Sequence, residues 1–436
     1  MEISGDEIAQ AVLKQFDKLP TKRKPLVRGG GVREWVPLSG IVVQGINSLT
    51  CLSAATGMKC LPQSKIPQAQ GIVLHDWHAE VLAIRSFNRF LLEECHALVT
   101  SQKKASEYIR YRQPEERTDE HFQPFALNDG ITLHMYCSEA PCGDASMELT
   151  MAAQEDATPW MIPSSTSSSP SPATTDTTSK YPSLDTTPPL SPSSPTQTPP
   201  PILHGRSYFS ALGIVRRKPS RPDAPPTLSK SCSDKLALSQ CISLLNSITS
   251  TLISPANAYI HTLVLPESQY SKTACDRAFG YSETGRMRRL NRMKWRGGYA
   301  FKPFRVSTTS LEFKYGRRGP VVSGEKLVPS NAAASWTANG KEETLIGGVL
   351  QGRKQFDVRG ASRMCKRRMW RLAMEVAGLV GVSVVERTLS GRMYRDVKEG
   401  EVLGERRRVK EDVRQSALEG WVRNGGNEFE VGGVES

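Results

Sequence analysis

The amino-acid sequence predicts a mixed α/β fold in one main domain. Apolar, strand-like runs alternate along the chain with segments in which apolar residues recur every three to four positions, as they do on one face of a helix. A chain of 436 residues can form one large domain or two ordinary ones. Its hydrophobic fraction of 38% is slightly low, but the deficit is concentrated in one polar stretch. The remainder can therefore bury a sizeable core.

The N-terminal residues 1–37 are interpreted as a helix followed by a basic loop. Ile8, Val12 and Phe16 are spaced by four residues, which predicts a short amphipathic helix. The segment TKRKPLVRGGGVREW is basic and rich in glycine, as expected for a loop. We expect residues 38–436 to form the main domain.

The main domain begins with strands and then alternates strands with helices. WVPLSGIVVQ predicts a strand, and LTCLSAATGMKCL predicts a strand region interrupted by turns. A helix is expected at about residues 78–97, and a buried strand at 131–137 is followed by a Pro-Cys-Gly turn and another helix. Further along, AYIHTLVLP and FRVSTTSLEFKY are typical of strands. SCSDKLALSQCISLLNSI, ASRMCKRRMWRLAMEVAGL and residues 409–422 are typical of helices.

One stretch cannot contribute to a packed core. Of the 39 residues from Pro163 to Pro201, 31 are Ser, Thr or Pro. Such a composition buries too little apolar surface to offset the entropy that is lost on ordering. We therefore expect a disordered insertion at about residues 160–203. We interpret it as an expanded loop of the main domain, because residues of related chemistry lie on both sides of it.

The charge balance favours a polyanionic partner. Lys and Arg outnumber Asp and Glu by 57 to 44, which gives a net charge of +13 and a pI of about 9.3. RNA, DNA, phosphorylated ligands or an anionic membrane surface would suit this excess. A soluble basic protein without such a partner is the simpler alternative.

Nothing in the sequence predicts export or membrane insertion. The N-terminus begins acidic and lacks the regions of a signal peptide, and no apolar run approaches the 18 residues of a membrane span. The nine cysteines are scattered and odd in number, which favours free thiols and metal ligands over disulfides. We expect an intracellular protein, in the nucleus, the cytoplasm or both, with no membrane partner.

Three short motifs raise the possibility of a catalytic zinc centre. His78 and Glu80 stand two residues apart in HAE, Cys142 lies in PCGD, and Cys232 lies in SCSDK. Catalytic zinc sites use three protein ligands, leave one position for water, and need a nearby carboxylate to carry the proton. An H-x-E motif followed by turns that contain Pro-Cys is how zinc nucleobase deaminases divide this work.

Each motif alone is a weak signal. His78 and Glu80 would lie on nearly opposite sides of an ideal helix, so they can share a pocket only if His78 sits where the backbone enters the first turn. The usual P-C-x-x-C spacing fails because residue 145 is Ala. Cys232 by itself is more simply a buried small residue, and HAE by itself is more simply the polar start of a helix.

In combination and in this order, the three motifs resemble the adenosine deaminases acting on RNA. HAEVLAIRSFNRFLL, PCGD and SCSDK carry the resemblance, supported by TGMKC, KPSRPDAPPTLSKSCSDK, GRMRRL, WRGGY and ASRMCK. The resemblance extends from about residue 38 to the C-terminus, excluding the insertion. Within the family, the sequence is most similar to the members that convert adenosine beside the tRNA anticodon to inosine. This resemblance implies a cytidine-deaminase-like three-layer core, in which a mixed central sheet has helices on both faces and C-terminal helical extensions.

The resemblance also implies roles for individual residues. His78, Cys142 and Cys232 would bind zinc, and Glu80 would carry the proton during attack at C6 of adenine. Members of the family bury inositol hexakisphosphate, which would neutralise cations that are costly to bury unpaired. The positions that match its contacts are Arg85, Lys235, Lys366, Tyr394, Lys398, Lys410 and Trp421.

Other positions concern the surroundings of these sites. Asp76 and Lys235 match the family's pair that links the inositol phosphate to the zinc site. Lys59 in TGMKC either contacts an RNA phosphate near the target nucleotide or is an ordinary exposed lysine. Lys230 departs from the methionine that usually precedes SCSDK. For the three arginines at 406–408 we favour a solvated face or contact with RNA phosphate.

The predicted substrate is tRNA, with no obligatory protein partner evident. The sequence contains no separate module of the α-β-β-β-α type, which relatives that edit long duplexes usually carry. A target adenosine already in a loop costs less to flip into a pocket than one in a duplex. Alternatives are a non-catalytic RNA-binding protein on a deaminase fold, an editor of other structured RNA, and a deaminase of free nucleosides. Glu80 argues against the first alternative and the net charge argues against the last.

Overall fold

The structure is a computed structural model that describes most of the chain. The described residues are 3–28, 31–46, 48–153, 203–204, 208–218, 224–319 and 325–430. Apart from its last residue, the insertion predicted at about residues 160–203 lies outside them.

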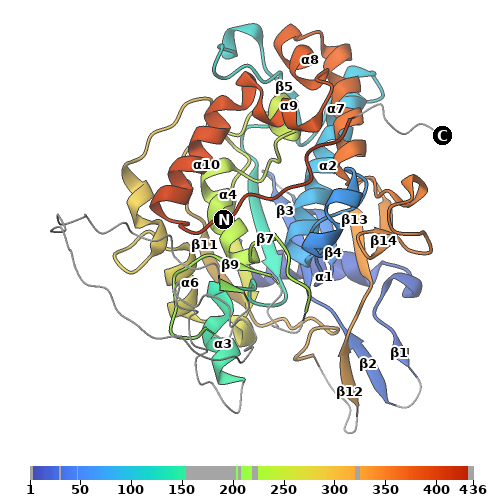
Figure 1. The fold of residues 1–436 in the computed structure, drawn as a ribbon, viewed down its shortest axis with the longest axis vertical. Helices are drawn as coiled ribbons and strands as arrows, with labels where there is room; N and C mark the ends of the chain where they lie inside the picture. Colours follow the sequence, from blue (N-terminus) through green and yellow to red (C-terminus); the bar gives the residue numbers. More distant parts are fainter. Residues whose placement is uncertain are drawn as a thin grey trace, which may run out of the picture.

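A mixed eight-stranded sheet forms the centre of the described structure (Figure 1). Its strands lie in the order β11-β10-β7-β3-β4-β13-β14-β15. The neighbours β7, β10 and β11 are parallel, and the other neighbours are antiparallel. The strands are β3 (Leu38–Gln44), β4 (Leu49–Thr56), β7 (Thr132–Cys137), β10 (Ile260–Pro266), β11 (Arg305–Thr309), β13 (Ala333–Thr337), β14 (Lys341–Ile346) and β15 (Val349–Leu350).

Helices cover both faces of this sheet, so the predicted three-layer α/β class is confirmed. On one face, Val12 and Phe16 of α1 pack in a core cluster with Val42 of β3. On the other face, Phe87 of α2 packs in a larger cluster with Ile41 of the same strand. The helices are α1 (Gly5–Asp17), α2 (Ala79–Val99), α3 (Met147–Ala152), α4 (Cys232–Ile242), α5 (Thr249–Leu252), α6 (Lys272–Phe279), α7 (Lys366–Val380), α8 (Ser383–Leu389), α9 (Tyr394–Glu399) and α10 (Gly404–Ser416).

The C-terminal helices extend the layer that contains α2 (Figure 1). The fully buried Trp370 of α7 donates its indole N–H to the Leu389 carbonyl at the end of α8, at 2.7 Å. The prediction of a helix at 409–422 was wrong in its bounds, because α10 begins at Gly404 and ends at Ser416. The chain leaves the helix where Leu418 turns into the core and Gly420 adopts a positive φ of 81°.

Smaller sheets lie at the margins of the central one. β1 (Val27–Arg28), β2 (Val32–Trp35) and β12 (Lys326–Pro329) form a three-stranded sheet, seen at the lower right of Figure 1. The two remaining pairs of strands are β5 (Ile109–Tyr111) with β6 (Phe125–Leu127) and β8 (Leu203–His204) with β9 (Arg216–Arg217).

Candidate active site

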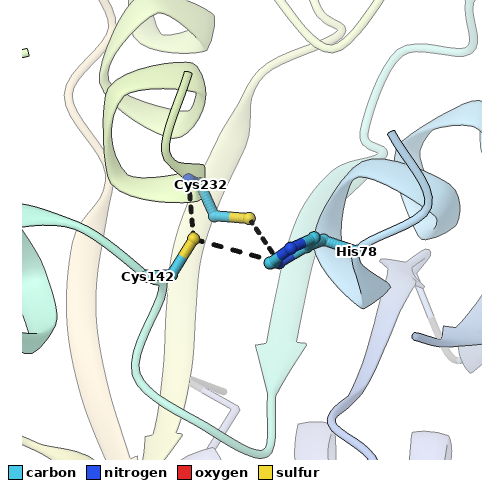
Figure 2. Close-up of side chains that lie close together, drawn as sticks. All are labelled: His78, Cys142 and Cys232. Atoms are coloured by element: carbon cyan, nitrogen blue, oxygen red, sulfur yellow. Dashed lines mark hydrogen bonds between the residues drawn. The ribbon is translucent and has the colours of Figure 1, made fainter. Parts of the chain in front are cut away.

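The candidate site lies at the edge of the sheet where β7 and β4 end. Ser39 pairs with Cys137, and Leu38 pairs with Thr56, so both strands have their carboxyl ends at this edge. The N-termini of α2 and α4 and the turn after β7 meet there (Figure 2). These three segments carry the three motifs that the sequence analysis singled out.

His78, Cys142 and Cys232 point toward one another (Figure 2). The His78 Nδ1 atom lies 3.9 Å from the Cys142 Sγ atom and 3.7 Å from the Cys232 Sγ atom. Tetrahedral zinc with ordinary bond lengths separates its ligand atoms by roughly 3.5–3.8 Å. One imidazole and two thiols at this spacing therefore form a donor set that can hold a metal ion and leave a fourth position free.

The turn that carries Cys142 is held against α4. Gly143 has a φ of 104°, and a Cβ atom there would meet the Ser231 side chain at 2.3 Å, so only glycine allows this close approach. The Ser233 hydroxyl donates to the Pro141 carbonyl at 2.8 Å, and the Cys232 N–H donates to the Cys142 Sγ atom at 3.3 Å. These contacts fix the two thiols side by side.

His78 lies immediately outside α2, which resolves the difficulty with the two-residue spacing of HAE. Its backbone is extended, with φ −61° and ψ 147°, and the helix begins at Ala79. The His78 N–H donates to the Asp76 Oδ1 atom at 3.0 Å, and the Ala79 N–H donates to the Gly57 carbonyl at 2.9 Å. Glu80 follows in the first turn, as predicted.

Glu80 has the environment of a proton carrier. Its side chain is buried, and burial raises the pKa of its carboxyl group. Negative charge on Cys142 raises this pKa further, whereas His78 and Lys218 lower it. A carboxyl group whose pKa is shifted up toward neutrality can both accept and release a proton under physiological conditions.

The electrostatics of the triad favour a thiolate at Cys142 and a proton on His78. A hydrogen bond from Cys232, together with Lys218 and His78, holds the pKa of the Cys142 thiol well below its usual value. Burial and the neighbouring Cys142 raise the pKa of Cys232. Burial lowers the pKa of His78, but Cys60 and Cys142 outweigh it and raise that pKa to about 10. A bound dication would hold both thiols ionised and the imidazole neutral.

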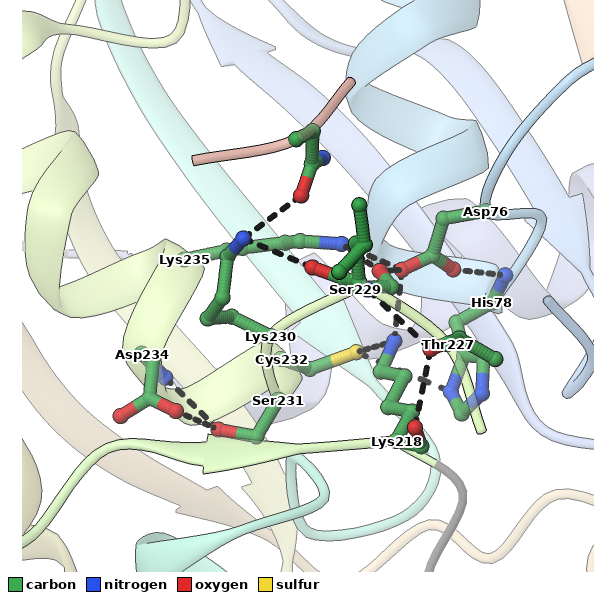
Figure 3. A network of polar contacts seen from close by, with 12 residues as sticks. Asp76, His78, Lys218, Thr227, Ser229, Lys230, Ser231, Cys232, Asp234 and Lys235 are labelled. Atoms are coloured by element: carbon green, nitrogen blue, oxygen red, sulfur yellow. Dashed lines mark hydrogen bonds and ion pairs between the residues drawn. The ribbon is translucent and has the colours of Figure 1, made fainter. Parts of the chain in front are cut away.

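A buried polar network surrounds Asp76 next to the triad (Figure 3). Lys218 Nζ lies 2.9 Å from the Asp76 Oδ2 atom and 3.2 Å from the Cys232 Sγ atom. Lys235 and Ser229 also donate to Asp76 Oδ2, which brings together the pair expected from the sequence. Burial would raise the pKa of Asp76, but the two lysines hold it well below its usual value.

Two members of this neighbourhood were missed by the sequence analysis. Lys218 lies in KPSRPD, a phrase that supported the resemblance, but its charge was not assigned a partner. Cys60 lies in TGMKC and forms a second group of potential ligand atoms with Asp76 and His78, all within 4.8 Å of one another. Proximity to Asp76 and His78 could have been found only from the three-dimensional arrangement.

Cations from separate elements converge on His75, one residue before Asp76. Burial lowers the pKa of His75 to about 2, and Lys366, Arg85, Lys235 and Lys398 contribute in that order. These four cations belong to α7, α2, α4 and α9, and all four were expected to surround a polyphosphate. The His75 Nε2 atom is buried and has no hydrogen-bond partner in the described structure.

We define the cation group as Arg85, Lys366, Lys398 and Lys410. Burial lowers the pKa of all four side chains, and Lys398 and Arg406 are among the cations that lower it further for their neighbours. Within the described part of the chain, no carboxylate forms an ion pair with any of them.

The oxygen atoms that do meet the cation group are uncharged. Lys366 donates to the Gly426 carbonyl at 2.8 Å and to the Asn427 side chain at 3.0 Å. The Arg85 Nε atom is buried without a partner among the described residues. Tyr394 lies between two of the lysines, with its ring 5.5 Å from Lys366 Nζ and 6.0 Å from Lys398 Nζ.

Lys230 and Trp421 join the loop before α4 to the C-terminal segment. Lys230 is buried, donates to the Leu228 and Val422 carbonyls and to the Asn424 side chain, and lies 5.1 Å from the Trp421 ring. The residue that departs from the family pattern is therefore a structural contact in this chain.

The expectation for the three arginines at 406–408 was wrong for the first of them. Arg406 is buried and donates to the Ile242 and Leu245 carbonyls, because α10 turns this side toward α4. Arg407 and Arg408 are exposed, as expected.

Lys59 is half-buried, and its carbonyl accepts from the Trp77 N–H at 3.1 Å, so its backbone is fixed near the triad.

No helix in the described ranges is long and apolar enough to cross a membrane.

Comparison with known proteins identifies the family. The pattern of the adenosine-deaminase (editase) domain matches residues 53–425. The chain is 35% identical over 433 residues to tRNA-specific adenosine deaminase 1 of Schizosaccharomyces pombe, which covers 98% of this chain and 96% of that protein. The protein of the same name from Saccharomyces cerevisiae is 33% identical over 252 residues, 57% of this chain and 55% of that protein. The double-stranded RNA-specific editase Adar of Drosophila melanogaster is 30% identical over 147 residues, 33% of this chain and 20% of that protein. The chain therefore belongs to the adenosine-deaminase (editase) family.

Proposed function

We propose that this protein converts adenosine to inosine in tRNA, at a position next to the anticodon, by zinc-dependent hydrolysis. The observation that carries the proposal is the His78, Cys142 and Cys232 triad with the buried Glu80 beside it. The similarity along almost the whole chain to a relative named for tRNA supports the substrate. The net charge of +13 suits a folded polyanion.

The proposed roles follow from the positions of the side chains. His78, Cys142 and Cys232 would hold zinc, which supplies a bound water of lowered pKa as the nucleophile. Glu80 would take a proton from the attacking water and deliver it to N1 of the adenine while the oxygen adds at C6. Glu80 then moves the second proton to the N6 amino group, which leaves as ammonia. Water and adenosine are consumed, and inosine and ammonia are formed.

The cation group supports inositol hexakisphosphate as a second, structural ligand. Four half-buried cations without a carboxylate partner among the described residues would repel one another, and a polyphosphate would offset that cost. Arg85, Lys366, Lys398 and Lys410 would hold its phosphates, with Lys235, Tyr394 and Trp421 at its margin. The network through Lys235 and Asp76 would connect this ligand to the zinc site.

We further propose that the protein acts inside the cell, in the nucleus, the cytoplasm or both, without an obligatory protein partner. Its nine cysteines are free in the structure, which suits a reducing compartment.

The enzyme proposal is tested by incubating the purified protein with tRNA and measuring inosine by nucleoside mass spectrometry. Glu80→Gln keeps the size of the side chain but cannot carry a proton, so it should abolish inosine formation and retain about one zinc per chain. Glu107→Gln, at an exposed position, is the matched control and should behave like the parent protein. A fully active Glu80→Gln protein would refute the proposed role of this carboxyl group.

The same assay separates the alternatives. A zinc-loaded parent protein that binds tRNA without forming inosine would be a non-catalytic RNA-binding protein. Inosine in another structured RNA but not in tRNA would identify an editor of that RNA.

For the second ligand, denaturation of the pure protein should release about one inositol hexakisphosphate per chain, detectable by mass spectrometry. A folded protein that releases none would contradict this part of the proposal.

A further inference from the structure

A second hollow opens at the same edge of the central sheet as the triad. It is a cleft of about 310 Å³ between the loop after α1, strand β2, the end of β4 and the loop before β13. The three-stranded sheet of β1, β2 and β12 lies at the margin of the central sheet (Figure 1), and Glu34 of its strand β2 lines the cleft. None of the roles proposed above uses this cleft.

The cleft is structurally continuous with the active site. Thr56 lines it, and the next residue, Gly57, accepts a hydrogen bond from Ala79, which follows His78. A second connection runs from the segment after β7 to the end of β2, next to the cleft residues Glu34 and Val36. The Arg317 N–H donates to the Glu139 Oε1 atom at 2.9 Å near the Cys142 turn, and the Arg317 guanidinium lies 5.9 Å from the ring of Trp35 at the end of β2.

The walls of the cleft combine apolar surfaces with hydrogen-bonding groups. Leu26 and Ile346 line it and are 53% and 42% exposed, which is unusual for large apolar side chains. Asn331 and Gln351 add amide donors and acceptors. A nucleobase needs this combination, because its faces are apolar and its edges form hydrogen bonds.

The charges of the cleft are arranged for a nucleotide whose phosphate stays outside. Glu34 is buried in the wall, where its Oε2 atom accepts from the Ser330 hydroxyl at 2.8 Å, so its carboxylate is held by the protein itself. Lys22 is exposed at the rim, and no described residue forms a hydrogen bond or ion pair with its ammonium group. A base inside the cleft and a phosphate beside Lys22 would place the negative charge of the nucleotide next to this exposed lysine.

We propose that this cleft binds one unstacked nucleotide of the RNA substrate, flanking the adenosine that enters the active site. The base lies between Leu26 and Ile346, and its phosphate contacts Lys22. The inference rests on the proposed function, since it assigns a second binding site for the same RNA substrate. An RNA segment is favoured over a peptide because the exposed charged side chain at the rim that has no carboxylate partner among the described residues, Lys22, is positive.

The phosphate contact is tested by the salt dependence of tRNA binding, measured by fluorescence anisotropy with protein that carries Glu80→Gln. Loss of one phosphate contact reduces the slope of log affinity against log salt by about one. Lys22→Ala should show this change and weaken binding about tenfold at physiological salt. The matched control is Lys104→Ala, an exposed lysine beyond the far end of α2, roughly 30 Å along the helix from His78. An unchanged slope in Lys22→Ala overturns the proposal.

The occupant of the cleft is tested by photo-crosslinking. With p-benzoyl-L-phenylalanine in place of Ile346, irradiation should join the protein to tRNA at one nucleotide close to the edited position. The same replacement at Leu379, which is 54% exposed on α7, should give no such product. Crosslinking of Ile346 to a protein but not to tRNA would overturn the proposal in favour of a peptide site.

These experiments separate the cleft from the function on which it rests. If the parent protein forms inosine in tRNA but Lys22→Ala and the Ile346 probe behave like their controls, the cleft proposal fails and the enzyme proposal stands. If the parent protein neither binds tRNA nor forms inosine in it, both proposals fail.

Discussion

The triad and the cation group are neighbours that balance their charges in different ways. At the triad, thiols, a carboxylate and lysines of opposite charge lie within hydrogen-bonding distance, so Lys218 is shared between Asp76 and Cys232. In the cation group, the described structure supplies carbonyl and amide oxygens but no carboxylate partner. The proposed metal ion would complete the first region, whereas the proposed polyphosphate would balance the positive charge of the second. The experiments below use this difference, from the largest expected effect to the smallest.

Loss of a triad ligand should have the largest effect. Cys142→Ser replaces a thiolate with a neutral hydroxyl group, which is a poor zinc ligand. We expect zinc content to fall from about one per chain to near zero and inosine formation to be lost. The decrease in metal affinity should exceed the roughly 100-fold that is typical for loss of an outer hydrogen bond. Metal analysis and nucleoside mass spectrometry measure the two effects.

The control for this change is Cys51→Ser. Cys51 is also buried, but it lies outside the triad and donates to the Ser53 carbonyl at 3.5 Å, which a serine hydroxyl can also do. It should leave zinc content unchanged. Normal zinc binding by Cys142→Ser would show that the geometry of the triad does not reflect a metal site.

Removal of one charge from the cation group should stabilise the ligand-free protein and destabilise the ligand-bound protein. Lys410→Met removes a half-buried charge that lacks a carboxylate partner among the described residues. Without polyphosphate, the variant should therefore be more stable than the parent by about 1–3 kcal/mol. With inositol hexakisphosphate bound, it should be less stable, because a phosphate contact is lost. Urea unfolding of both forms, with Lys104→Met as the control, measures the two free energies.

The pH dependence of stability should also be opposite in the ligand-free and the ligand-bound protein. Burial lowers the pKa of Lys366 and Lys410 in the folded protein, so the unfolded chain binds more protons above those values. The stability of the ligand-free protein should therefore increase as pH rises toward the ordinary lysine pKa of about 10.4. Bound phosphates would instead raise these pKa values, and the stability of the loaded protein should be lost above them. Parallel pH profiles for the two forms would contradict a polyphosphate site here.

The sequence predicted the triad better than it predicted the surroundings of the triad. HAE and the following apolar residues determine a local structure, the start of α2, so the positions of His78 and Glu80 could be inferred from neighbouring residues. Burial of a charged side chain depends instead on which distant elements cover it. Arg406 and Lys218 are buried by contacts with residues more than 140 positions away, and no local pattern marks them as different from solvated cations. The end of α10 was misplaced for a similar reason, because the buried position of Leu418 is set by tertiary packing.

The smallest effect is expected at Lys218, which contacts both Asp76 and Cys232 beside the triad. Lys218→Met would leave Asp76 with Lys235 as its cation and would remove the hydrogen bond to the Cys232 sulfur atom. Outer hydrogen bonds of this kind typically contribute 10–100-fold to metal affinity or activity. We therefore expect weaker zinc binding by about tenfold in competition with a chelator, and a partly reduced rate of inosine formation.

Zinc affinity distinguishes this role of Lys218 from a purely structural one. If Lys218 only supported the fold, the variant would unfold more easily but bind zinc as tightly as the parent protein. If it tunes the Cys232 thiolate, zinc affinity falls even at temperatures where the variant is fully folded. Lys235→Met offers the matched comparison, because Lys235 also pairs with Asp76 but has no contact with either thiol among the described residues. A decrease in zinc affinity in Lys218→Met but not in Lys235→Met would assign the effect to the sulfur contact and not to the charge on Asp76.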